Sequence, residues 1–234
     1  MFGLCRGSLA EYACASESTV VLKPSGVSFE DAASTPIATL TATQGLRDHG
    51  RLQAGQRVLI NGAAGGVGTF AVQLAHAWGA HVDGVCSTRN LDLVRSLGAR
   101  RVFDYTREDF TRSGERYHLI FDLAANHSIG EYRRVLVPGG IIVMAGGGGS
   151  DGHAMGSRIV RAMTGAALWK LRGQRMFFFV ASLKMEDLTA VGELIASGRL
   201  KPVIDSRYSL GETSQAMRHL SGGHARGKVV ITVD

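Results

Sequence analysis

Apolar residues between residues 57 and 145 alternate between two kinds of segment, and this alternation predicts the fold class. Short apolar runs with β-branched residues predict strands at residues 57–61, 81–86, 102–105, 119–124 and 141–144. Apolar positions at helical spacing predict helices at residues 69–78, 91–97 and 129–137. Strands and helices that alternate at these lengths form an α/β fold with a doubly wound parallel sheet.

The last third of the chain follows a different pattern. It contains a Gly-rich loop at 145–157, a helix at 158–171, a strand at 176–181, an amphipathic helix within 182–200 and a helix at 212–220. The segments "KPVIDSRYSL" and "GKVVITVD" predict two strands around the last helix. Strand-rich ends around an α/β centre suggest a second domain built from both termini.

The turn "NGAAGGVG" at residues 61–68 joins the first strand to the first helix of the sheet. Unpaired N–H groups and a positive dipole at a helix N-terminus attract phosphate, and glycines let a pyrophosphate approach the backbone. The letters fit G-x-G-x-x-G with alanine first, and also the T-G-x-x-x-G-x-G of short-chain reductases with asparagine first. A tight turn in any α/β protein would look similar, but the flanking strand and helix favour a dinucleotide site.

The short-chain reductase alternative requires a tyrosine with a lysine four residues later, because the lysine lowers the pKa of the phenol. None of the five tyrosines satisfies this spacing. The residues found there are Ser16, Asp109, Phe121, Leu136 and Glu212.

The tip of the second strand predicts which coenzyme is preferred. NAD-selective folds place an acid there for the ribose hydroxyls, but Asp83 lies three residues short of the strand end. At the tip, Ser87 offers a hydroxyl and Arg89 offers a planar cation suited to a phosphate. Tyr105 ends the next strand and can flank the same phosphate. We therefore expect NADPH to be preferred over NADH, although Arg89 would also suit a solvated helix start.

Composition narrows the class of protein. The 234 residues are 45% hydrophobic and 20% charged, enough for one large or two small domains. No apolar stretch reaches bilayer-spanning length and "MFGLCRGSLAEY" is unlike a signal peptide, so we expect a soluble cytoplasmic protein with no membrane partner. The net charge of +6 is spread along the chain, which argues against nucleic acid. Three scattered cysteines and eight histidines without H-x-x-H spacing predict no metal site.

Several motifs in order along the chain resemble the medium-chain dehydrogenase/reductase superfamily. They include "NGAAGGVG", "GVCSTRNLDLVRSLGA", "FDLAANHS", "RRVLVPGGIIVMAG" and "GHARGKVVITVD". The closest likeness is to its zinc-free quinone oxidoreductase and enone reductase branch. The resemblance implies a Rossmann-type domain at 36–180, a remnant of a GroES-like β-rich catalytic domain at 1–35, and a segment returning to it at 181–234. Family members carry most of the GroES-like domain upstream, so we expect an incomplete substrate pocket in this chain.

The resemblance implies NADPH-dependent hydride transfer to a quinone or an α,β-unsaturated carbonyl. Zinc-using members place a last catalytic ligand just before the cofactor domain, where residues 35–39 here contain no thiol, imidazole or carboxylate, so no catalytic zinc is expected. Two alternatives stay open: an alcohol dehydrogenase of the same superfamily, and a non-enzymatic NADPH-binding protein with a truncated substrate cleft.

The resemblance and the glycine turn together assign a set of cofactor-binding residues. We expect a homodimer as in relatives, formed through the aromatic strand 176–182 if that strand is an exposed sheet edge. No side chain is assigned as a catalytic acid or base. The predicted cofactor-binding residues are Thr41, Ala63, Gly65, Gly66, Val67, Gly68, Ser87, Arg89, Tyr105, Asp122, Ala124, Ala145, Gly146 and Lys228.

Overall fold

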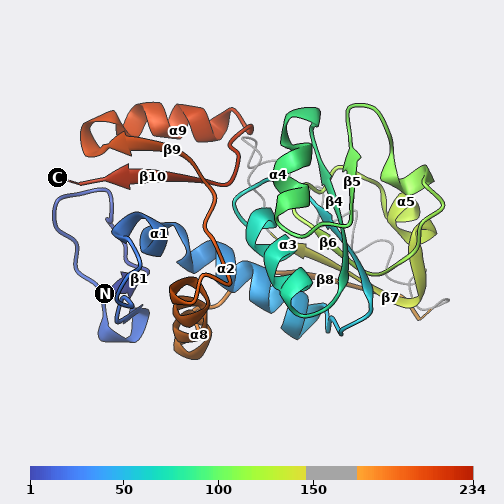
Figure 1. The fold of residues 1–234 in the computed structure, drawn as a ribbon, viewed down its shortest axis with the longest axis horizontal. Helices are drawn as coiled ribbons and strands as arrows, with labels where there is room; N and C mark the ends of the chain where they lie inside the picture. The colour runs from blue at the N-terminus through green and yellow to red at the C-terminus, as the bar shows by residue number, and fades with distance from the viewer. Residues whose placement is uncertain (146–172, 234) are drawn as a thin grey trace.

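A computed structural model describes residues 1–145 and 173–233, and its centre is a six-stranded parallel sheet (Figure 1). The strands lie in the order β5-β4-β3-β6-β7-β8. Within this sheet the chain runs from β3 outward through β4 to β5. It then crosses back to β6 on the other side of β3 and continues through β7 to β8, so the direction of strand addition reverses between β3 and β6. This arrangement confirms the predicted doubly wound sheet. The strands are β3 (Arg57–Asn61), β4 (His81–Cys86), β5 (Arg101–Asp104), β6 (Tyr117–Asp122), β7 (Leu136–Ala145) and β8 (Arg175–Phe179).

Two apolar layers sandwich the sheet, because alternate residues of each strand point to opposite faces. On β3, Val58 and Ile60 belong to one buried cluster and Leu59 to the other. The first face is covered by α2 (Pro36–Thr43), the π-helical turn η2 (Gln44–His49), α3 (Gly68–Ala77) and α4 (Leu91–Ser96). The second face is covered by η4 (Phe110–Arg112) and α5 (Ile129–Arg134). A short turn η3 (Thr88–Asn90) precedes α4.

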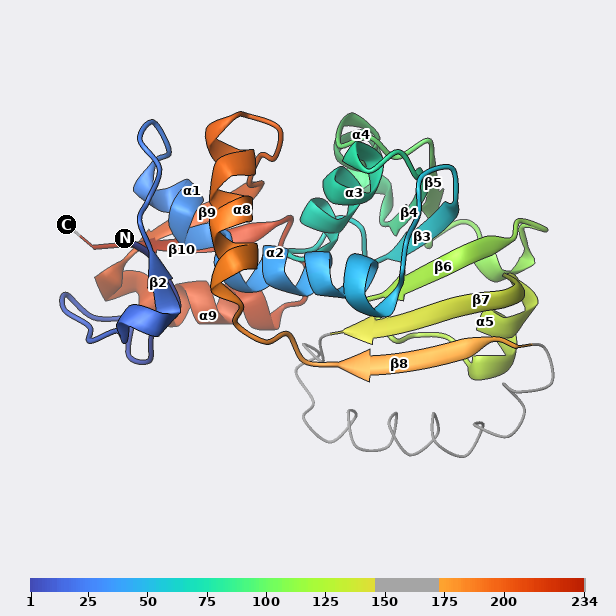
Figure 2. The same ribbon diagram turned by 90° about the horizontal axis from the view of Figure 1, so that it is seen from below.

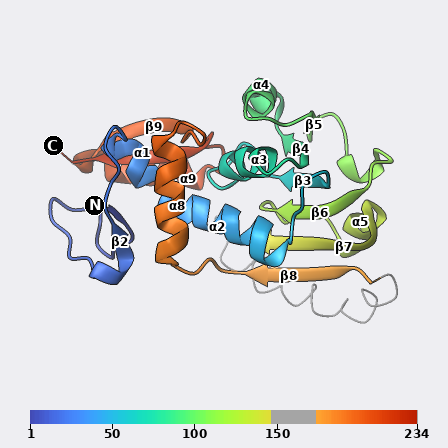
Figure 3. The same ribbon diagram turned by 60° about the horizontal axis from the view of Figure 1, so that its bottom comes forward.

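The two ends of the chain lie side by side, away from the sheet (Figures 1 and 2). Phe2, Val27 and Ala32 from the N-terminal end pack with Leu188 in a third buried cluster. Figure 3 shows α2 running from this end of the molecule toward the sheet. The elements here are β1 (Phe2–Gly3), η1 (Glu17–Thr19), β2 (Val20–Val21), α1 (Phe29–Ser34), α8 (Met185–Ala196), β9 (Ile204–Ser209), η6 (Leu210–Glu212), α9 (Thr213–Ser221) and β10 (Lys228–Thr232).

Two predicted boundaries near the site were wrong. Strand β6 ends at Asp122 rather than 124, because the N–H groups of Ala124 and Ala125 turn back to the Asp122 carboxylate. The helix predicted at 129–137 ends at Arg134, and the strand predicted from 141 begins earlier, so residues 138–140 lie inside β7. They form an irregularity in that strand, where Leu136 pairs with Tyr117 and Ile141 with Leu119.

The other predicted elements that fall within the described residues agree with the structure in type and order, while the elements before residue 57 were not predicted. Among the described strands, β8 lies at an edge of the sheet, as the homodimer prediction required. The helix predicted at 158–171 and most of the loop predicted at 145–157 lie outside the described residues. In the described ranges, no helix is both long enough and apolar enough to span a membrane.

Candidate functional site

The turn between β3 and α3 packs its backbone tightly around two glycines. Gly62 has a φ of +90°, and its carbonyl accepts a hydrogen bond from the Gly65 N–H at 3.1 Å. A Cβ on Gly68 would lie 2.1 Å from that carbonyl oxygen, so only glycine lets α3 begin this close to the strand. A Cβ on Gly65 would meet only the same oxygen, at 3.4 Å. Gly68 therefore closes the turn, and Gly65 leaves open space for a ligand.

A cavity of about 500 Å³ opens over this turn, at the carboxyl ends of β3, β4 and β6. Ligands of open α/β sheets bind at this position, where the strand order reverses, and the volume suits a small-molecule site. Most of the predicted cofactor-binding residues line it. They are residues 65–68, Ser87, Arg89, Tyr105, Ala124 and Ala145.

The polar residues predicted at the tip of β4 lie together at the cavity. Ser87, Arg89 and Tyr105 line one end of the cavity. The Arg89 guanidinium donates a hydrogen bond to the His224 backbone carbonyl, which joins this end of the cavity to the segment before β10. Asp83 is fully buried and accepts hydrogen bonds from Arg57, Arg100 and Tyr117. Asp83 is therefore committed to a network within the fold rather than to a ribose.

Asn90 supplies a buried polar atom without a partner. It lines the cavity, and its Nδ2 donates to the Ser87 hydroxyl at 3.2 Å. Within the described residues, its Oδ1 is buried and accepts no hydrogen bond. Such an orphaned acceptor costs about 1–3 kcal/mol unless a ligand or water donates to it. Ribose hydroxyls and an adenine amino group are both donors of the kind it lacks.

A buried network behind the cavity holds the segment that follows β6. The Asp122 carboxylate accepts hydrogen bonds from the Asn61 amide at 2.9 Å and the Tyr132 hydroxyl at 2.5 Å. Asn61 also donates to Asn126 at 2.8 Å. Ala125 has a φ of +51°, a conformation that non-glycine residues seldom adopt. The network therefore fixes Ala124 and Asn126, which line the cavity.

The C-terminal segment forms part of the glycine turn. The N–H of Gly227 donates to the Ala64 carbonyl at 2.9 Å, and Gly65 pairs with Gly227 as an isolated β-bridge. The Lys228 side chain runs along the turn, and its Cδ lies 3.1 Å from where a Gly66 Cβ would be. Burial lowers the pKa of Lys228 because it disfavours the charged ammonium. An anion bound beside the side chain would stabilise that ammonium. Residues 65–68 therefore lead into the N-terminus of α3 with the Lys228 side chain beside them.

Five predicted residues are not among those that line the cavity. The Thr41 hydroxyl donates to the Ile37 carbonyl within α2, and Ala63 is buried beneath the turn. Asp122 and Lys228 lie directly behind the lining, and Gly146 lies outside the described residues.

Other lining residues were missed by the sequence analysis: Asn61, Cys86, Asn90, Asn126 and residues 223–225. Asn61 was visible as a polar residue ending an apolar strand. The segment 223–225 reaches the cavity only through tertiary packing, which no local pattern shows. Burial raises the pKa of Cys86 to about 11, so this thiol stays neutral at physiological pH.

A search of known proteins finds matches over nearly the whole chain. The family model described as zinc-binding dehydrogenase matches residues 97–231. A chloroplastic quinone-oxidoreductase of Triphysaria versicolor is 35% identical over 96% of this chain and 68% of its own length. The chloroplastic NADPH-dependent alkenal/one oxidoreductase of Arabidopsis thaliana is 34% identical over 96% of this chain and 53% of its own length.

A solved structure agrees with these relatives. The quinone oxidoreductase from Coxiella burnetii superposes with a TM-score of 0.82 at 32% identity, over 95% of this chain and 66% of that one. The chain thus spans about one half to two thirds of the length of the relatives it matches. Its sequence and its fold together show that the chain belongs to the zinc-binding dehydrogenase family of the medium-chain dehydrogenase/reductase superfamily.

Proposed function

We propose that the cavity binds a nicotinamide dinucleotide and that the chain forms the coenzyme-binding part of an NADPH-dependent reductase of quinones or α,β-unsaturated carbonyls. The observation that carries this proposal is the open space over the Gly65 backbone, at the N-terminus of α3 and in a cavity at the switch point of the sheet. Relatives that are named for quinone and alkenal/one reduction support the substrate class.

The proposed preference for NADPH rests on the tip of β4. A 2′-phosphate there would meet Ser87, Arg89 and Tyr105. Among the described residues that line the cavity there is no acid: Asp83 is held in its own buried network, and the Asp104 carboxylate beside this tip accepts hydrogen bonds from Thr88 and Thr106. Arg89 already donates to the His224 carbonyl. Its guanidinium has five N–H donors, so a phosphate can be bound without breaking that contact. The segment 223–225 then helps to place the arginine.

The coenzyme, when bound, supplies the hydride, and the residues of this chain bind and orient the coenzyme. The N–H groups of the turn and the Lys228 ammonium would hold the pyrophosphate, while the Asp122 network holds the cavity wall. We propose that no zinc takes part, since residues 35–39 offer no ligand and a conjugated carbonyl already spreads the developing negative charge.

A homodimer through β8 is also proposed. Within the described strands, β8 pairs on one side only, with β7, so its other edge carries unpaired backbone groups. Phe178 and Val180 near that edge are 44% and 84% exposed. Light scattering at micromolar concentration should give twice the chain mass, and a monomer throughout would refute the dimer.

The experiment that tests the function measures coenzyme oxidation by the protein with a quinone, with an alkenal, and with neither. We expect NADPH oxidation that depends on one of these acceptors and is unaffected by zinc chelators. Coenzyme-dependent alcohol oxidation that chelators abolish would instead support the alcohol dehydrogenase alternative. Tight NADPH binding with no turnover of any acceptor would support the non-enzymatic alternative.

A further inference from the structure

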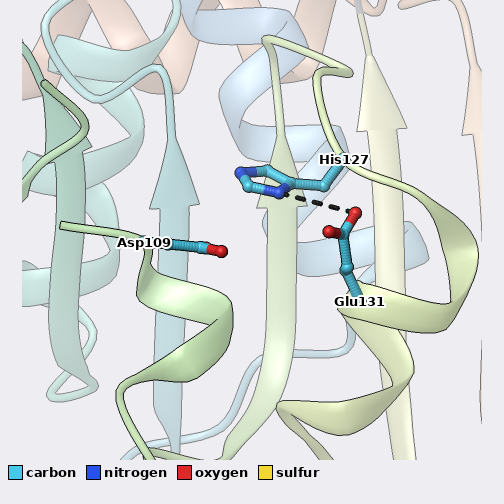
Figure 4. Close-up of side chains that lie close together, drawn as sticks. All are labelled: Asp109, His127 and Glu131. Carbon is cyan, nitrogen blue, oxygen red and sulfur yellow. Dashed lines mark ion pairs between the residues drawn. The ribbon is translucent and has the colours of Figure 1, made fainter.

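Three potential metal ligands converge behind the cavity, on the sheet face that carries η4 and α5. One ligand atom each from Asp109, His127 and Glu131 lies within 4.8 Å of the other two, and all three side chains are partly buried (Figure 4). They come from separate places: Asp109 begins η4, His127 follows β6, and Glu131 is in the first turn of α5. No local spacing in the sequence joins Asp109 to the other two, so a sequence motif cannot reveal this cluster.

The imidazole of His127 packs against aromatic rings, and among the described residues it has no hydrogen-bond partner. Its ring centroid lies 4.7 Å from that of Phe110 and 5.7 Å from that of Tyr132, both edge to face. The nearest carboxylate oxygen to its Nδ1, among the residues that the structure describes, is Glu131 Oε2 at 3.8 Å. That distance is beyond hydrogen-bonding reach. The ring is therefore oriented, and its nitrogen is available to a further partner.

Each carboxylate is anionic and keeps lone pairs free. Burial works against ionisation of Asp109, but hydrogen bonds from Thr111 hold its pKa below the ordinary value. Hydrogen bonds from the Ser128 N–H and hydroxyl lower the pKa of Glu131. Those bonds use Asp109 Oδ1 and Glu131 Oε2. Within the described part of the chain, the charged partners of the other two oxygens are Arg112, at 3.4 Å from Asp109 Oδ2, and Arg134, at 4.0 Å from Glu131 Oε1, and both arginine side chains are mostly exposed.

We propose that Asp109, His127 and Glu131 bind a divalent transition-metal cation of the zinc type, with water completing the coordination. One imidazole and two carboxylates are ligands that Zn²⁺ accepts, at about 2.0–2.2 Å. Tetrahedral ligands at that distance are about 3.4 Å apart. From the present separations, each ligand atom therefore moves inward by roughly 1 Å or less. Exposed Arg112 and Arg134 can turn to solvent as the cation takes their place.

This site is distinct from a catalytic zinc and would act on the cavity wall from behind. A bound cation joins η4 to the end of the segment that leads from β6 into α5, and to α5 itself. Asn126, next to His127, lines the cavity, and Tyr132, against the His127 ring, donates to Asp122. The cation should therefore stiffen the segment that carries Ala124 and Asn126. The proposal does not depend on the identity of the ligand in the cavity.

The test is calorimetric titration of Zn²⁺ alone into the metal-free protein without an affinity tag. We expect one saturable site with a micromolar dissociation constant. Asp109→Asn and Glu131→Gln should each weaken binding by about tenfold or more. Both variants can keep their helix caps, since asparagine and glutamine cap as the acids do. His127→Ala should weaken binding at least as much.

His219→Ala is the matched control. His219 forms the other histidine–carboxylate contact among the described ion pairs, at 2.7 Å from Asp205 on the surface, but with no second acid close by. This variant should bind Zn²⁺ like the parent. Unsaturable binding in the parent, or equal affinity in the parent and in all three cluster variants, would overturn the proposal. Thermal unfolding without metal must first show that each variant is folded. If another variant does not fold, Asp109→Asn by itself still tests the site.

Discussion

Two buried tyrosine–aspartate pairs lie on the same face of the sheet, one toward each end of the strands. Toward the amino ends, Tyr117 donates to Asp83 at 3.0 Å, and toward the carboxyl ends, Tyr132 donates to Asp122 at 2.5 Å. Strand β3 contributes to both networks, because Arg57 at its start binds Asp83 and Asn61 at its end binds Asp122. Leu59 lies between them in the apolar core of that face.

The partners of the two acids differ, and the difference separates structure from function. Asp83 is neutralised by the cations Arg57, at the start of β3, and Arg100, just before β5, and none of these three residues lines the cavity described above. Asp122 is held by neutral donors, two of them backbone N–H groups of the segment that lines the cavity. In a parallel sheet the carboxyl ends carry the binding site. A buried acid therefore stabilises the fold at one end and shapes the wall of the cavity at the other.

Asp83→Ala should give the largest difference between the two ends of the strands, in the free energy of unfolding. The variant loses the buried carboxylate, leaves the Tyr117 hydroxyl without its acceptor and opens a void in the core, so it should lose about 3 kcal/mol of unfolding free energy. The dissociation constant for NADPH should not change in the folded fraction. Urea denaturation and a coenzyme titration measure the two quantities, and a large loss of affinity would place Asp83 in the site after all.

A paired substitution tests the same comparison more evenly. Tyr117→Phe and Tyr132→Phe each remove one hydroxyl that donates to a buried carboxylate, and each should cost roughly 2 kcal/mol of stability. Only Tyr132→Phe should also weaken NADPH binding, by about tenfold, or about 1.4 kcal/mol. Equal coenzyme affinities in the two variants would show that the Asp122 network does not position the cavity wall.

Arg89→Ala tests the coenzyme preference at the carboxyl ends. A charge-assisted hydrogen bond to a 2′-phosphate should be lost, so the preference for NADPH over NADH should fall by roughly 1.5 kcal/mol. The comparison is a titration of both coenzymes against both proteins. Equal affinities for the two coenzymes in the parent would contradict the assignment of the β4 tip.

The smallest effect concerns the thiols. Cys86 is buried at the cavity, and burial raises its pKa to about 11, whereas Cys5 and Cys14 are exposed. At pH 8 an alkylating reagent should therefore label Cys5 and Cys14 and leave Cys86 unmodified. Labelling of Cys86 should increase only as the pH approaches 11, where the buried thiol ionises. Because burial favours the neutral thiol, the folded state should also lose stability as the pH rises toward that value. Peptide mass analysis reads each site.

The sequence predicted the sheet and the glycine turn because both depend on local patterns. Apolar periodicity located the strands. Asp83 was excluded as a ribose ligand because it lies three residues before the end of β4, and the structure shows it in a buried network instead. The partners of Asp122 were not predictable in the same way. Tyr132 and Asn61 meet it only after β3, β6 and α5 pack together, and Ala125 has an unusual φ that no residue type announces.

The far wall of the cavity shows the same limit. Lys228 was singled out from its motif, but the contact of Gly227 with the turn and the contact of Arg89 with His224 connect residues more than one hundred positions apart. Local patterns carry no information about such pairs. The residues missed were therefore those that tertiary packing brings to the cavity from other elements.

The central claim is that the backbone at Gly65 receives the pyrophosphate of a dinucleotide, and titration of NADPH into Gly65→Ala tests it most directly. The added methyl group meets only the Gly62 carbonyl oxygen, at 3.4 Å, so the fold should tolerate it. Gly211→Ala is the control, because a Cβ there would contact nothing within 4 Å. We predict that Gly65→Ala weakens NADPH binding at least about tenfold, or about 1.4 kcal/mol, with unchanged thermal stability, while Gly211→Ala binds like the parent. Equal NADPH affinity in the parent and Gly65→Ala would contradict the account and place the phosphate site elsewhere.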